Sequence, residues 1–555
     1  MKTKCPFLMR LVAYGVTIHG LFLIASALAE ELFVHYGHGI HLHISGFNFN
    51  IPLFMGLTLL YVSLYLRRGK WTAWLSAVII YVAMLLLTAT RLFLDVGPEH
   101  HELAYILRGI LLPSLLLFGL VQQMQHFKVK SDLRSFAFSL RFIVLVLGVT
   151  FIYGVSGMIL MDRSDFHREI TFGEAAHQTV DQFGLTTDEL VPHTRRAKVF
   201  LDSLSVISAA SVGYGLISLF QPIRARLSNE SASRKLATRL LKHYGGNSED
   251  FFKLWPRDKH YFFALSQKSG VAYNVHRGVV VTVGDPFGDP KEFPRLLQEF
   301  DEFCRTNDWQ PAFIHTVPKY NHLYKTHGYG LQKIGEEAII SLDTFTATTI
   351  RGKYFRQINN RFTKNGYYVE MLRPPHNTEI IERLHEISDE WLQQPGRTER
   401  GFLMGWFSEA YMDQCNVVVL RDSQGDIQAF LNQVTSYDVQ EANFDFLRHA
   451  SDAPSNSNDF LLMEFAKQLH QEGFTRLNMG LCPLSGLDEN DEARSVIDNA
   501  LRFVYANGDR FYSFSGLRRF KSKYDPQWES RYIAYRGGIR GFTRMLSALN
   551  RALRP

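Results

Sequence analysis

Long apolar runs set the first ~220 residues apart from a remainder in which apolar and polar positions alternate over short distances. A helix that crosses a bilayer needs about 20 mostly apolar residues. Six segments meet this condition, at approximate positions 11–29, 51–66, 71–89, 104–122, 136–161 and 199–221. The pattern predicts an N-terminal α-helical membrane bundle with six spans over residues 1–222.

The charges between the apolar segments predict how the bundle is oriented. Basic residues follow the second, fourth and sixth segments, beginning with Arg67, Lys128 and Arg224. Because loops rich in Lys and Arg stay on the cytoplasmic side, we expect both termini and the C-terminal half in the cytosol. The first segment ends in Glu30-Glu31 rather than at a small-residue cleavage site, so we expect a membrane span and not a cleaved signal peptide.

Two arginines, Arg91 and Arg108, lie inside or at the edge of apolar segments. An arginine at membrane depth is energetically costly and needs a partner. The functional interpretation is a lipid phosphate held by these guanidinium groups. The alternative is structural, with an ion pair to Asp95 or a side chain that reaches the membrane surface.

The remainder of the chain predicts strands and helices in alternation. A basic, Ser-rich linker at 223–250 contains a helix at 234–244. A first cycle has strands at 261–265, 271–275, 279–283 and 312–315, helices at 293–307 and 320–327, and a strand pair around 331–342. A second cycle starts near Lys353 and has helices at 377–393 and 460–472 and strands at 417–420, 427–435, 443–447 and 476–479. We therefore expect an α/β C-terminal half with two similar units, at 251–345 and 346–536.

Residues 537–555 predict a basic amphipathic helix. One face carries apolar residues, namely Ile539, Phe542, Leu546, Leu549 and Leu553, and arginines occupy the other faces. Such a helix is typical of a segment that lies on anionic lipid. Packing against the protein's own core is the alternative.

Composition and motifs narrow the chemistry. The 555 residues contain 60 Lys and Arg against 54 Asp and Glu, a net charge of +6, which permits anionic partners without requiring them. The four cysteines form no Cys-x-x-Cys pair, so neither a disulfide framework nor a zinc-thiolate site is expected. The sequence also lacks the phosphate, dinucleotide and acetyl-CoA loops and the His-Glu-x-x-His and Gly-x-Ser-x-Gly motifs. We expect no cofactor and no metal.

Three stretches, in this order, resemble a known family. They cover 333–342 with 356–366, then 443–448 with 459–462 and 477–487, then 511–521 with 523–528 and 531–532. They are similar to the C-terminal synthase domain of the phosphatidylglycerol lysyltransferases (lysylphosphatidylglycerol synthetases), the multiple-peptide-resistance family, here with a shortened membrane region. The stretch 324–329 also resembles the closing element of acetyltransferase-like (GNAT) folds, so the resemblance implies tandem GNAT units, the second of them catalytic.

The resemblance implies transfer of an amino acid from aminoacyl-tRNA to the glycerol hydroxyl of phosphatidylglycerol, with lysine as the first choice. It implies a bacterial cytoplasmic membrane protein that makes the membrane less anionic and gives resistance to cationic antibiotic peptides. An ester is exchanged for an ester, so the step needs no ATP. The alternatives are alanyl or arginyl transfer, an acyltransferase with a donor other than tRNA, and a lipid-binding membrane protein. The oligomeric state stays open.

Three residues carry the implied catalysis. Asp445 and Arg448 match the family's Asp-x-x-Arg, and Lys521 matches the lysine that follows a Gly-Leu-Arg-Arg-Phe run. Asp445 suits the ammonium group of the amino acid, and Arg448 and Lys521 suit a phosphate or a developing oxyanion. The alternatives are a surface salt bridge for the first pair and a solvated basic face for the lysine.

Four further residues are expected to bind substrate: Asp459, Asn478, Ser485 and Arg518. The structural alternatives are a helix N-cap for Asp459, a turn for Asn478 and Ser485, and a solvated basic face for Arg518. Glu336 and Glu337 are candidates for acid–base chemistry, although surface carboxylates are common.

Overall fold

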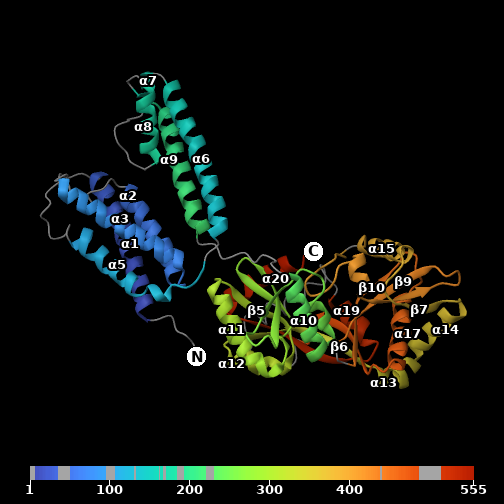
Figure 1. Cartoon of the computed structure of the whole chain (residues 1–555). Helices are drawn as coiled ribbons and strands as arrows, with labels where there is room; N and C mark the ends of the chain where they lie inside the picture. Colours follow the sequence, from blue (N-terminus) through green and yellow to red (C-terminus); the bar gives the residue numbers. More distant parts are fainter. Residues whose placement is uncertain are drawn as a thin grey trace. The chain divides into compact units, whose positions relative to one another are not determined.

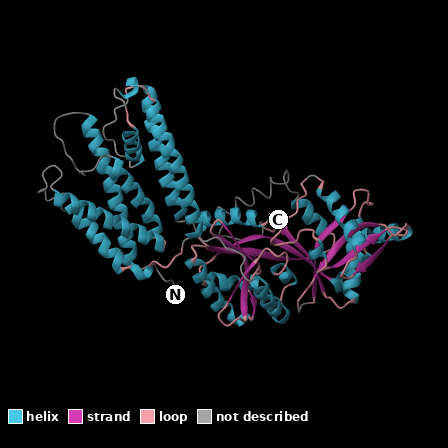
Figure 2. Cartoon of the chain, turned by 45° about the horizontal axis from the view of Figure 1, so that its top comes forward, coloured by secondary structure: helices cyan, strands magenta, loops and turns pink. Residues whose placement is uncertain are grey.

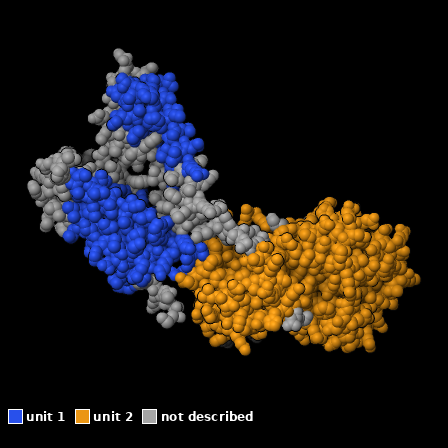
Figure 3. Space-filling model, viewed as in Figure 1, with its two compact units in different colours: residues 1–223, 305–308 blue, residues 224–304, 309–555 orange. Residues whose placement is uncertain are grey.

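The computed structural model describes residues 7–35, 50–94, 107–130, 133–161, 163–166, 170–183, 193–219, 230–394, 396–437, 440–486 and 514–554. The chain forms two compact units, which Figure 3 colours separately. Unit 1 comprises Met1–Ile223 with Arg305–Asp308, and unit 2 comprises Arg224–Cys304 with Trp309–Pro555.

Unit 1 is helical. Its elements are α1 (Phe7–His35), α2 (Asn50–Leu66), α3 (Trp71–Leu94), η1 (Leu107–Leu111), α5 (Leu112–Gln122), η2 (Met124–His126), α6 (Leu133–Leu160), α7 (Arg163–Phe166), α8 (Phe172–Phe183) and α9 (Arg195–Leu219). Within the described residues, three stretches are long and apolar enough to cross a membrane, Phe7–Ser26, Trp71–Thr90 and Ile143–Leu160, while Met55–Leu66 and Gly109–Gln122 are shorter apolar helices. The expected apolar N-terminal helices are present, and the complete six-span bundle stays a prediction.

Unit 2 contains one continuous mixed sheet, drawn in magenta in Figure 2. The strands lie in the order β1-β2-β3-β5-β12-β6-β11-β10-β9-β8-β7, and β4 (Phe287–Gly288) pairs with β2. Their bounds are β1 (His260–Phe263), β2 (Ser269–His276), β3 (Val279–Val283), β5 (Gln310–Thr316), β6 (Gly330–Ser341), β7 (Tyr368–Leu372), β8 (Asn416–Arg421), β9 (Ile427–Val434), β10 (Glu441–His449), β11 (Arg476–Pro483) and β12 (Gln527–Tyr535). The sheet confirms an α/β C-terminal half.

Helices cover both faces of this sheet, as Figure 1 shows. They are α10 (Glu230–Tyr244), α11 (Phe293–Thr306), α12 (Asn321–Thr326), α13 (Leu342–Ala347), α14 (Lys353–Lys364), α15 (Thr378–Leu392), α16 (Glu409–Met412), α17 (Ser457–Gln471), α19 (Phe514–Ser522) and α20 (Gly538–Ala552), with short turns η3 (Ser248–Lys253), η4 (Pro290–Glu292), η5 (Pro318–Tyr320) and η6 (Thr349–Arg351). One core cluster takes buried residues from α10, α15 and α20, and a second takes them from α13, α14 and α17.

The two halves of the sheet repeat one arrangement and exchange their last strands. β3 pairs in parallel with β5 after the crossover helix α11, and β10 pairs in parallel with β11 after α17. The strand that ends each half then pairs in the other half: β6 lies against β11, and β12 lies against β5. Residues near the centre of the sheet therefore come from both halves of unit 2.

The strand pair expected around 331–342 is wrong, because Gly330–Ser341 forms the single strand β6. Gly335 interrupts the apolar pattern there. It has φ +149°, and a Cβ at this position would lie 2.3 Å from the carbonyl oxygen of Cys482. The glycine allows neighbouring backbones to approach closely without ending the strand.

Candidate functional site

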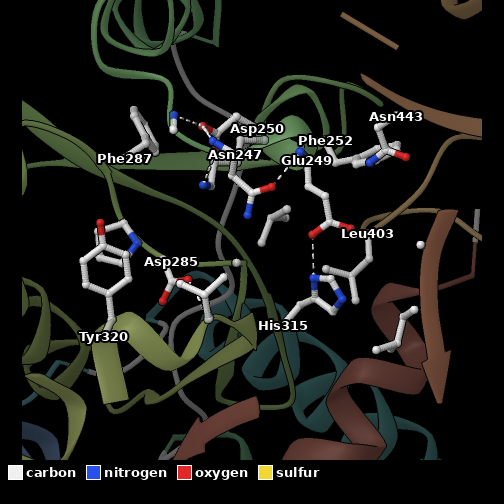
Figure 4. Close-up of a pocket in the computed structure, with 18 of the residues that line it drawn as sticks. Asn247, Glu249, Asp250, Phe252, Asp285, Phe287, His315, Tyr320, Leu403 and Asn443 are labelled. Atoms are coloured by element: carbon white, nitrogen blue, oxygen red, sulfur yellow. Dashed lines mark hydrogen bonds and ion pairs between the residues drawn. The ribbon is translucent and has the colours of Figure 1, made fainter. Parts of the chain in front are cut away.

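A cavity of about 480 Å³ lies within unit 2. Its walls come from β3, β5, β10 and β11, from η3 and α19, and from Leu403 and Met404 of the segment before α16. Figure 4 shows Glu249, Asp285 and His315 among the side chains that line it. A cavity with apolar walls and a few converging charged groups is the usual form of a small-molecule site.

Asp445 reaches the cavity from the middle of β10. The pairing of β10 with β9 shifts register between Phe444 and Leu447, so a bulge sets the direction of this side chain. One carboxylate oxygen accepts hydrogen bonds from the hydroxyl of Tyr411, at 2.6 Å, and from the backbone N–H of Gly405, at 2.7 Å. Burial raises the pKa of Asp445 to about 6, against these hydrogen bonds, so the group is mostly ionised at pH 7.

Asp285 lines the same cavity and is held in the same way. It accepts hydrogen bonds from the hydroxyl of Tyr324, at 2.8 Å, and from the backbone N–H of Val317, at 2.9 Å. Burial raises its pKa to about 6 as well. A buried carboxylate with two donors and a raised pKa is a costly group, which is typical of a site that binds charge.

The two aspartates occupy equivalent positions in the two halves of the sheet. The parallel pairing of β3 with β5 ends at Val283, and that of β10 with β11 ends at Asn443. Aspartate is the second residue after each of these positions. The duplicated strand arrangement thus presents one carboxylate from each half to a single cavity.

Lys521 supplies a cation to this cavity from α19. Its ammonium group donates to the carbonyl oxygens of Gly480, at 2.9 Å, and Leu481, at 3.1 Å, and its side chain is buried. Burial lowers the pKa of Lys521, although neighbouring ionisable groups oppose the shift. Two carbonyls thus hold the ammonium group in place beside the cavity.

A buried ion-pair cluster forms another wall. The Nδ1 atom of His315 lies 2.7 Å from a carboxylate oxygen of Glu249, and its Nε2 atom lies 2.9 Å from one of Glu337. Arg531 of β12 pairs with the other oxygen of Glu337. Burial alone lowers the pKa of His315, but the two carboxylates raise it to about 10, so the ring is an imidazolium at neutral pH.

The three residues Glu249, His315 and Glu337 also offer ligand atoms within 4.8 Å of one another, a spacing that suits a metal ion. Both ring nitrogens of His315 already face carboxylates, however, and Glu337 also pairs with Arg531. Arg531 also pairs with Glu529 at 3.3 Å, so each of the two cations already has two carboxylate partners. The cluster is therefore complete as an ion-pair network, and we assign no metal to it.

Arg448 lies on β10 beside this site but not among the cavity-lining residues. Its guanidinium pairs with Glu399 at 3.0 Å, donates to Ser388, and lies over the rings of Trp391 and Phe446. Glu399 in turn accepts from the backbone N–H of Phe407. Arg448 thus fixes the segment that brings Leu403, Met404 and Gly405 to the cavity.

A family model described as phosphatidylglycerol lysyltransferase, C-terminal, matches residues 238–535, more than half of the chain. The chain belongs to this family. The resemblance expected from the three sequence stretches is confirmed.

Relatives and solved structures agree with this family assignment. The chain is 31% identical over 355 residues to the phosphatidylglycerol lysyltransferase of Bacillus subtilis (strain 168), covering 61% of this chain and 40% of that protein. It is 30% identical over 322 residues to the one from Staphylococcus epidermidis (strain ATCC 12228 / FDA PCI 1200), covering 58% and 38%. The chain therefore spans about 40% of the length of these curated relatives.

Two solved structures share the fold of unit 2. L-PGS from Bacillus licheniformis has a TM-score of 0.52 at 31% identity, over 59% of this chain and 98% of that one. The C-terminal domain of a putative lysylphosphatidylglycerol synthetase from Agrobacterium fabrum has a TM-score of 0.51 at 28% identity, over 59% and 97%. The α/β part of the chain thus resembles these two domains in fold, and the tandem GNAT description stays a prediction.

The expected substrate-binding residues lie beside the cavity rather than in its wall. Asn478 is buried, donates to Glu337 at 3.2 Å and accepts from the backbone of Gly480. Ser485 donates to the carbonyl of Cys482 within a turn. Arg518 pairs with Glu336 at 2.7 Å and lies over the ring of Trp528. These three residues have protein partners and are not among those that line the cavity, and their role in binding substrate stays a prediction.

Asp459 lies in the first turn of α17, whose N-cap position is Asn456, so the N-cap interpretation is wrong. Its carboxylate accepts from Lys523, at 2.9 Å, and from the hydroxyl of Tyr524, at 3.0 Å. It thus joins α17 to the end of α19. The side chains of Arg91 and Arg108 lie outside the described residues.

Sequence reasoning missed Asp285, His315 and Glu249. Asp285 was visible only as part of a Gly-Asp-Pro turn after a strand, a loop position where binding residues often lie. His315 has φ +68° at the end of β5, an uncommon backbone conformation for a non-glycine residue. Of the two glutamates singled out in the sequence, Glu337 contacts His315, whereas Glu336 pairs with Lys333 and Arg518.

Proposed function

We propose that this protein transfers an amino acid, lysine by preference, from aminoacyl-tRNA to the glycerol hydroxyl of phosphatidylglycerol. Membership of the phosphatidylglycerol lysyltransferase family and the charged cavity of unit 2 support the proposal. The product carries less negative charge than phosphatidylglycerol, so the membrane binds cationic peptides more weakly. The three apolar helices of unit 1 support a place in the bacterial cytoplasmic membrane, with unit 2 on the cytosolic side.

The charge inventory of the cavity is the observation that carries the proposal. Glu249 is paired with His315 and Asp250 with Lys253, at 2.7 and 2.5 Å. Within the described part of the chain, Asp285 and Asp445 have no cationic side chain at ion-pair distance, and Lys521 has no carboxylate there.

Two unpaired carboxylates match the two ammonium groups of a lysyl ester. Alanine has one ammonium group and leaves one buried carboxylate unpaired, which costs free energy. Because Asp445 belongs to the motif of the reaction centre, we assign it to the α-ammonium group and Asp285 to the side-chain ammonium group. Lys521 then faces the ester or a phosphate oxygen.

The reaction exchanges one ester for another. The glycerol hydroxyl oxygen attacks the carbonyl carbon of the aminoacyl ester, the bond from that carbon to the ribose oxygen breaks, and the proton of the glycerol hydroxyl ends on the released ribose hydroxyl. Negative charge develops on the carbonyl oxygen in the transition state. A fixed ammonium group such as that of Lys521 stabilises this charge without reorganisation. Neither ATP nor a cofactor is needed.

The test uses the full chain expressed in a bacterial host, with lipids analysed by mass spectrometry. We expect a phosphatidylglycerol species heavier by one lysyl residue, absent with Asp445→Asn and retained with the matched control Asp343→Asn, whose side chain is 75% exposed. Purified protein given lysyl-tRNA makes the same lipid, and ribonuclease treatment of the donor stops it. An unchanged lipid profile with verified membrane insertion contradicts the proposal and favours lipid binding alone.

A further inference from the structure

The C-terminal end of the chain is basic and free of acidic residues. No aspartate or glutamate follows Glu529, whereas arginine occurs at 531, 536, 540, 544, 551 and 554. The helix α20 contains three of these arginines. Protein surfaces usually intersperse both signs of charge, so an acid-free helix indicates a partner that is negatively charged.

The inner face of α20 is part of the core of unit 2. Phe542, Met545, Ala548 and Ala552 are buried, and the helix packs on β2, β3 and β12. Gly541 permits the close approach, because a Cβ there would lie 1.8 Å from the carbonyl oxygen of Arg536. This face is therefore unavailable to a membrane, and the helix is held in a fixed orientation on the sheet.

The outer face carries two separate rows. Ile539 is 55% exposed and Leu546 is 40% exposed, and Leu546 follows Ile539 by seven positions, which places both on one line along the helix. Arg540, Arg544 and Arg551 are exposed and form a second row, about 130° around the helix, with exposed Thr543, Ser547 and Asn550 between the two rows. A solvent-facing surface with aliphatic side chains along one edge and arginines along the other is the pattern of a helix that lies at a lipid surface.

No described carboxylate lies within ion-pair distance of these arginines. The hydrogen-bond partner of Arg544 is the side-chain oxygen of Gln310, at 3.5 Å. Arg277, which is exposed on the turn between β2 and β3, donates to Ser547 of α20 at 3.4 Å and adds a further charge. The guanidinium groups of Arg544 and Arg277 thus contact neutral partners and keep their charge available to an external anion.

The helix α10 also presents basic residues to the solvent. It contributes Ala237, Leu240 and Leu241 to the core cluster that also contains the inner face of α20. Its exposed residues include Lys235, Arg239 and Lys242. Both helices therefore cover the same core and present positive charge to the solvent.

We propose that the outer face of α20 is a docking surface for an anionic phospholipid bilayer, with Arg540 and Arg544 against lipid phosphates and Ile539 and Leu546 among the headgroups. A bilayer fits better than a nucleic acid because a phosphate backbone offers no apolar partner to exposed isoleucine and leucine. Unit 2 also follows, in the same chain, three helices that are apolar enough to cross a membrane. This docking is independent of the proposed transfer reaction.

The experiment places a fluorescent NBD label on an Ile539→Cys variant of the full chain, in a Cys5→Ser background because the other three cysteines are buried. The protein is reconstituted into nanodiscs of phosphatidylcholine alone or with phosphatidylglycerol, and doxyl-labelled lipids act as quenchers. We expect strong quenching only with phosphatidylglycerol, and less quenching as salt rises. Each arginine changed to glutamate should lower the ratio of docked to undocked protein at least fivefold, since one basic residue near an anionic surface contributes about 1 kcal/mol.

The double variant Arg540→Glu/Arg544→Glu is compared with Arg356→Glu/Lys364→Glu on α14, whose residues pack in the other core cluster. Loss of quenching in the first variant and not in the second supports docking. Equal quenching in both lipid compositions, or quenching unaffected by the α20 changes, overturns it. Weakened binding of aminoacyl-tRNA with unchanged quenching also overturns it and assigns the surface to nucleic acid. If the double variant unfolds at a lower temperature, the test is the salt dependence of quenching in the protein that keeps both arginines. Quenching that falls as salt rises supports docking, and quenching unaffected by salt overturns it.

Discussion

The two halves of the sheet in unit 2 bring the same group to one cavity from the same position. Asp285 and Asp445 each follow a parallel strand pair, and each accepts one tyrosine hydroxyl and one backbone N–H. Burial raises the pKa of both to about 6. The tyrosines come from different elements, α12 in one half and α16 in the other. The position is therefore duplicated, while the donors that hold each carboxylate are supplied independently.

The surroundings of the two aspartates differ in their cations. Near Asp285 the cation His315 is neutralised by Glu249 and Glu337, whereas Lys521 faces the cavity without a carboxylate partner. A buried carboxylate is thus present in both halves. Lys521 of α19 is a buried lining cation with no carboxylate partner among the described residues, whereas Lys319 of η5, which also lines the cavity, is exposed and lies over the ring of Tyr320. In the proposed reaction, this asymmetry would orient the lysyl ester, with its ammonium groups toward the aspartates and its carbonyl oxygen toward Lys521.

The largest expected effect on the transfer rate comes from removing the ammonium group of Lys521. Lys521→Ala should lower kcat about 100- to 1,000-fold, the usual cost of losing one group that stabilises an oxyanion. Lys521→Arg keeps the charge and should recover part of the rate. The measurement is transfer from labelled lysyl-tRNA to phosphatidylglycerol by the purified chain. A change confined to KM contradicts a role in the transition state and leaves Lys521 as a binding group.

The next effect compares the two aspartates directly. Asp285→Asn should lower kcat/KM for a lysyl donor about 10- to 100-fold, the cost of a lost hydrogen-bonded charge. A donor acetylated on the side-chain amine lacks the second positive charge and should be insensitive to this change. Asp445→Asn should impair both donors. Equal sensitivity of both donors to Asp285→Asn contradicts the assignment of Asp285 to the side-chain ammonium group.

The Asp285→Asn variant also tests how much the buried charge of Asp285 lowers the free energy of unfolding. The folded-state pKa of Asp285 is raised, so its contribution to stability falls as pH rises from about 4 to 6 and stays low above that. We therefore expect Asp285→Asn to be more stable than the unchanged chain at pH 8, by up to about 3 kcal/mol. Thermal unfolding at pH 4 should show no such gain.

The strand pattern made most of unit 2 predictable. The apolar run at 279–283 coincides with β3, and the expected helix at 293–307 ends one residue beyond α11. By contrast, β12 was missed although it lies in the middle of the sheet. Its sequence contains Glu529 and Arg531, and Arg531 is buried because it pairs with Glu337 of β6. The hydrophobic pattern depends only on the residues of one segment. It therefore misses a strand with charged residues whose ion-pair partners lie on a strand distant in sequence.

The residues of the candidate site also differ in whether the sequence alone could predict them. Asp445 and Lys521 belong to sequence motifs of the family and line the cavity. Asp285 and His315 depend on partners remote in sequence, and the sequence marked Asp285 only by its Gly-Asp-Pro turn. Arg448 carried a motif too, but its contacts with Glu399 and Trp391 make it a positioning residue for the segment above Asp445. A motif therefore predicts that a residue matters without saying whether it faces the substrate.

A fourth prediction compares the two aspartates through the pH dependence of the transfer. Because the pKa values of Asp285 and Asp445 are about 6, kcat/KM for the lysyl donor should fall below pH 6 as both carboxylates lose their charge. With both titrating, the decline approaches 100-fold per pH unit, and Asp285→Asn should reduce it to about tenfold. An identical slope in the two proteins contradicts a role for Asp285 in binding the donor.

The smallest effect is expected at a carboxylate outside the cavity. Asp459 pairs with Lys523 and Tyr524, so Asp459→Asn removes a structural contact between α17 and α19 and should cost about 1–3 kcal/mol of unfolding free energy. Asparagine still accepts from the tyrosine hydroxyl, and the cavity keeps both of its unpaired aspartates, so kcat/KM should change less than about threefold, where a substrate-binding carboxylate would cost tenfold or more. The two readouts separate the alternatives: a stability loss with intact transfer makes Asp459 a structural residue. A tenfold fall in kcat/KM with an unchanged unfolding temperature instead places it in contact with the substrate, and the comparison then extends to a third carboxylate that α17 brings to the donor.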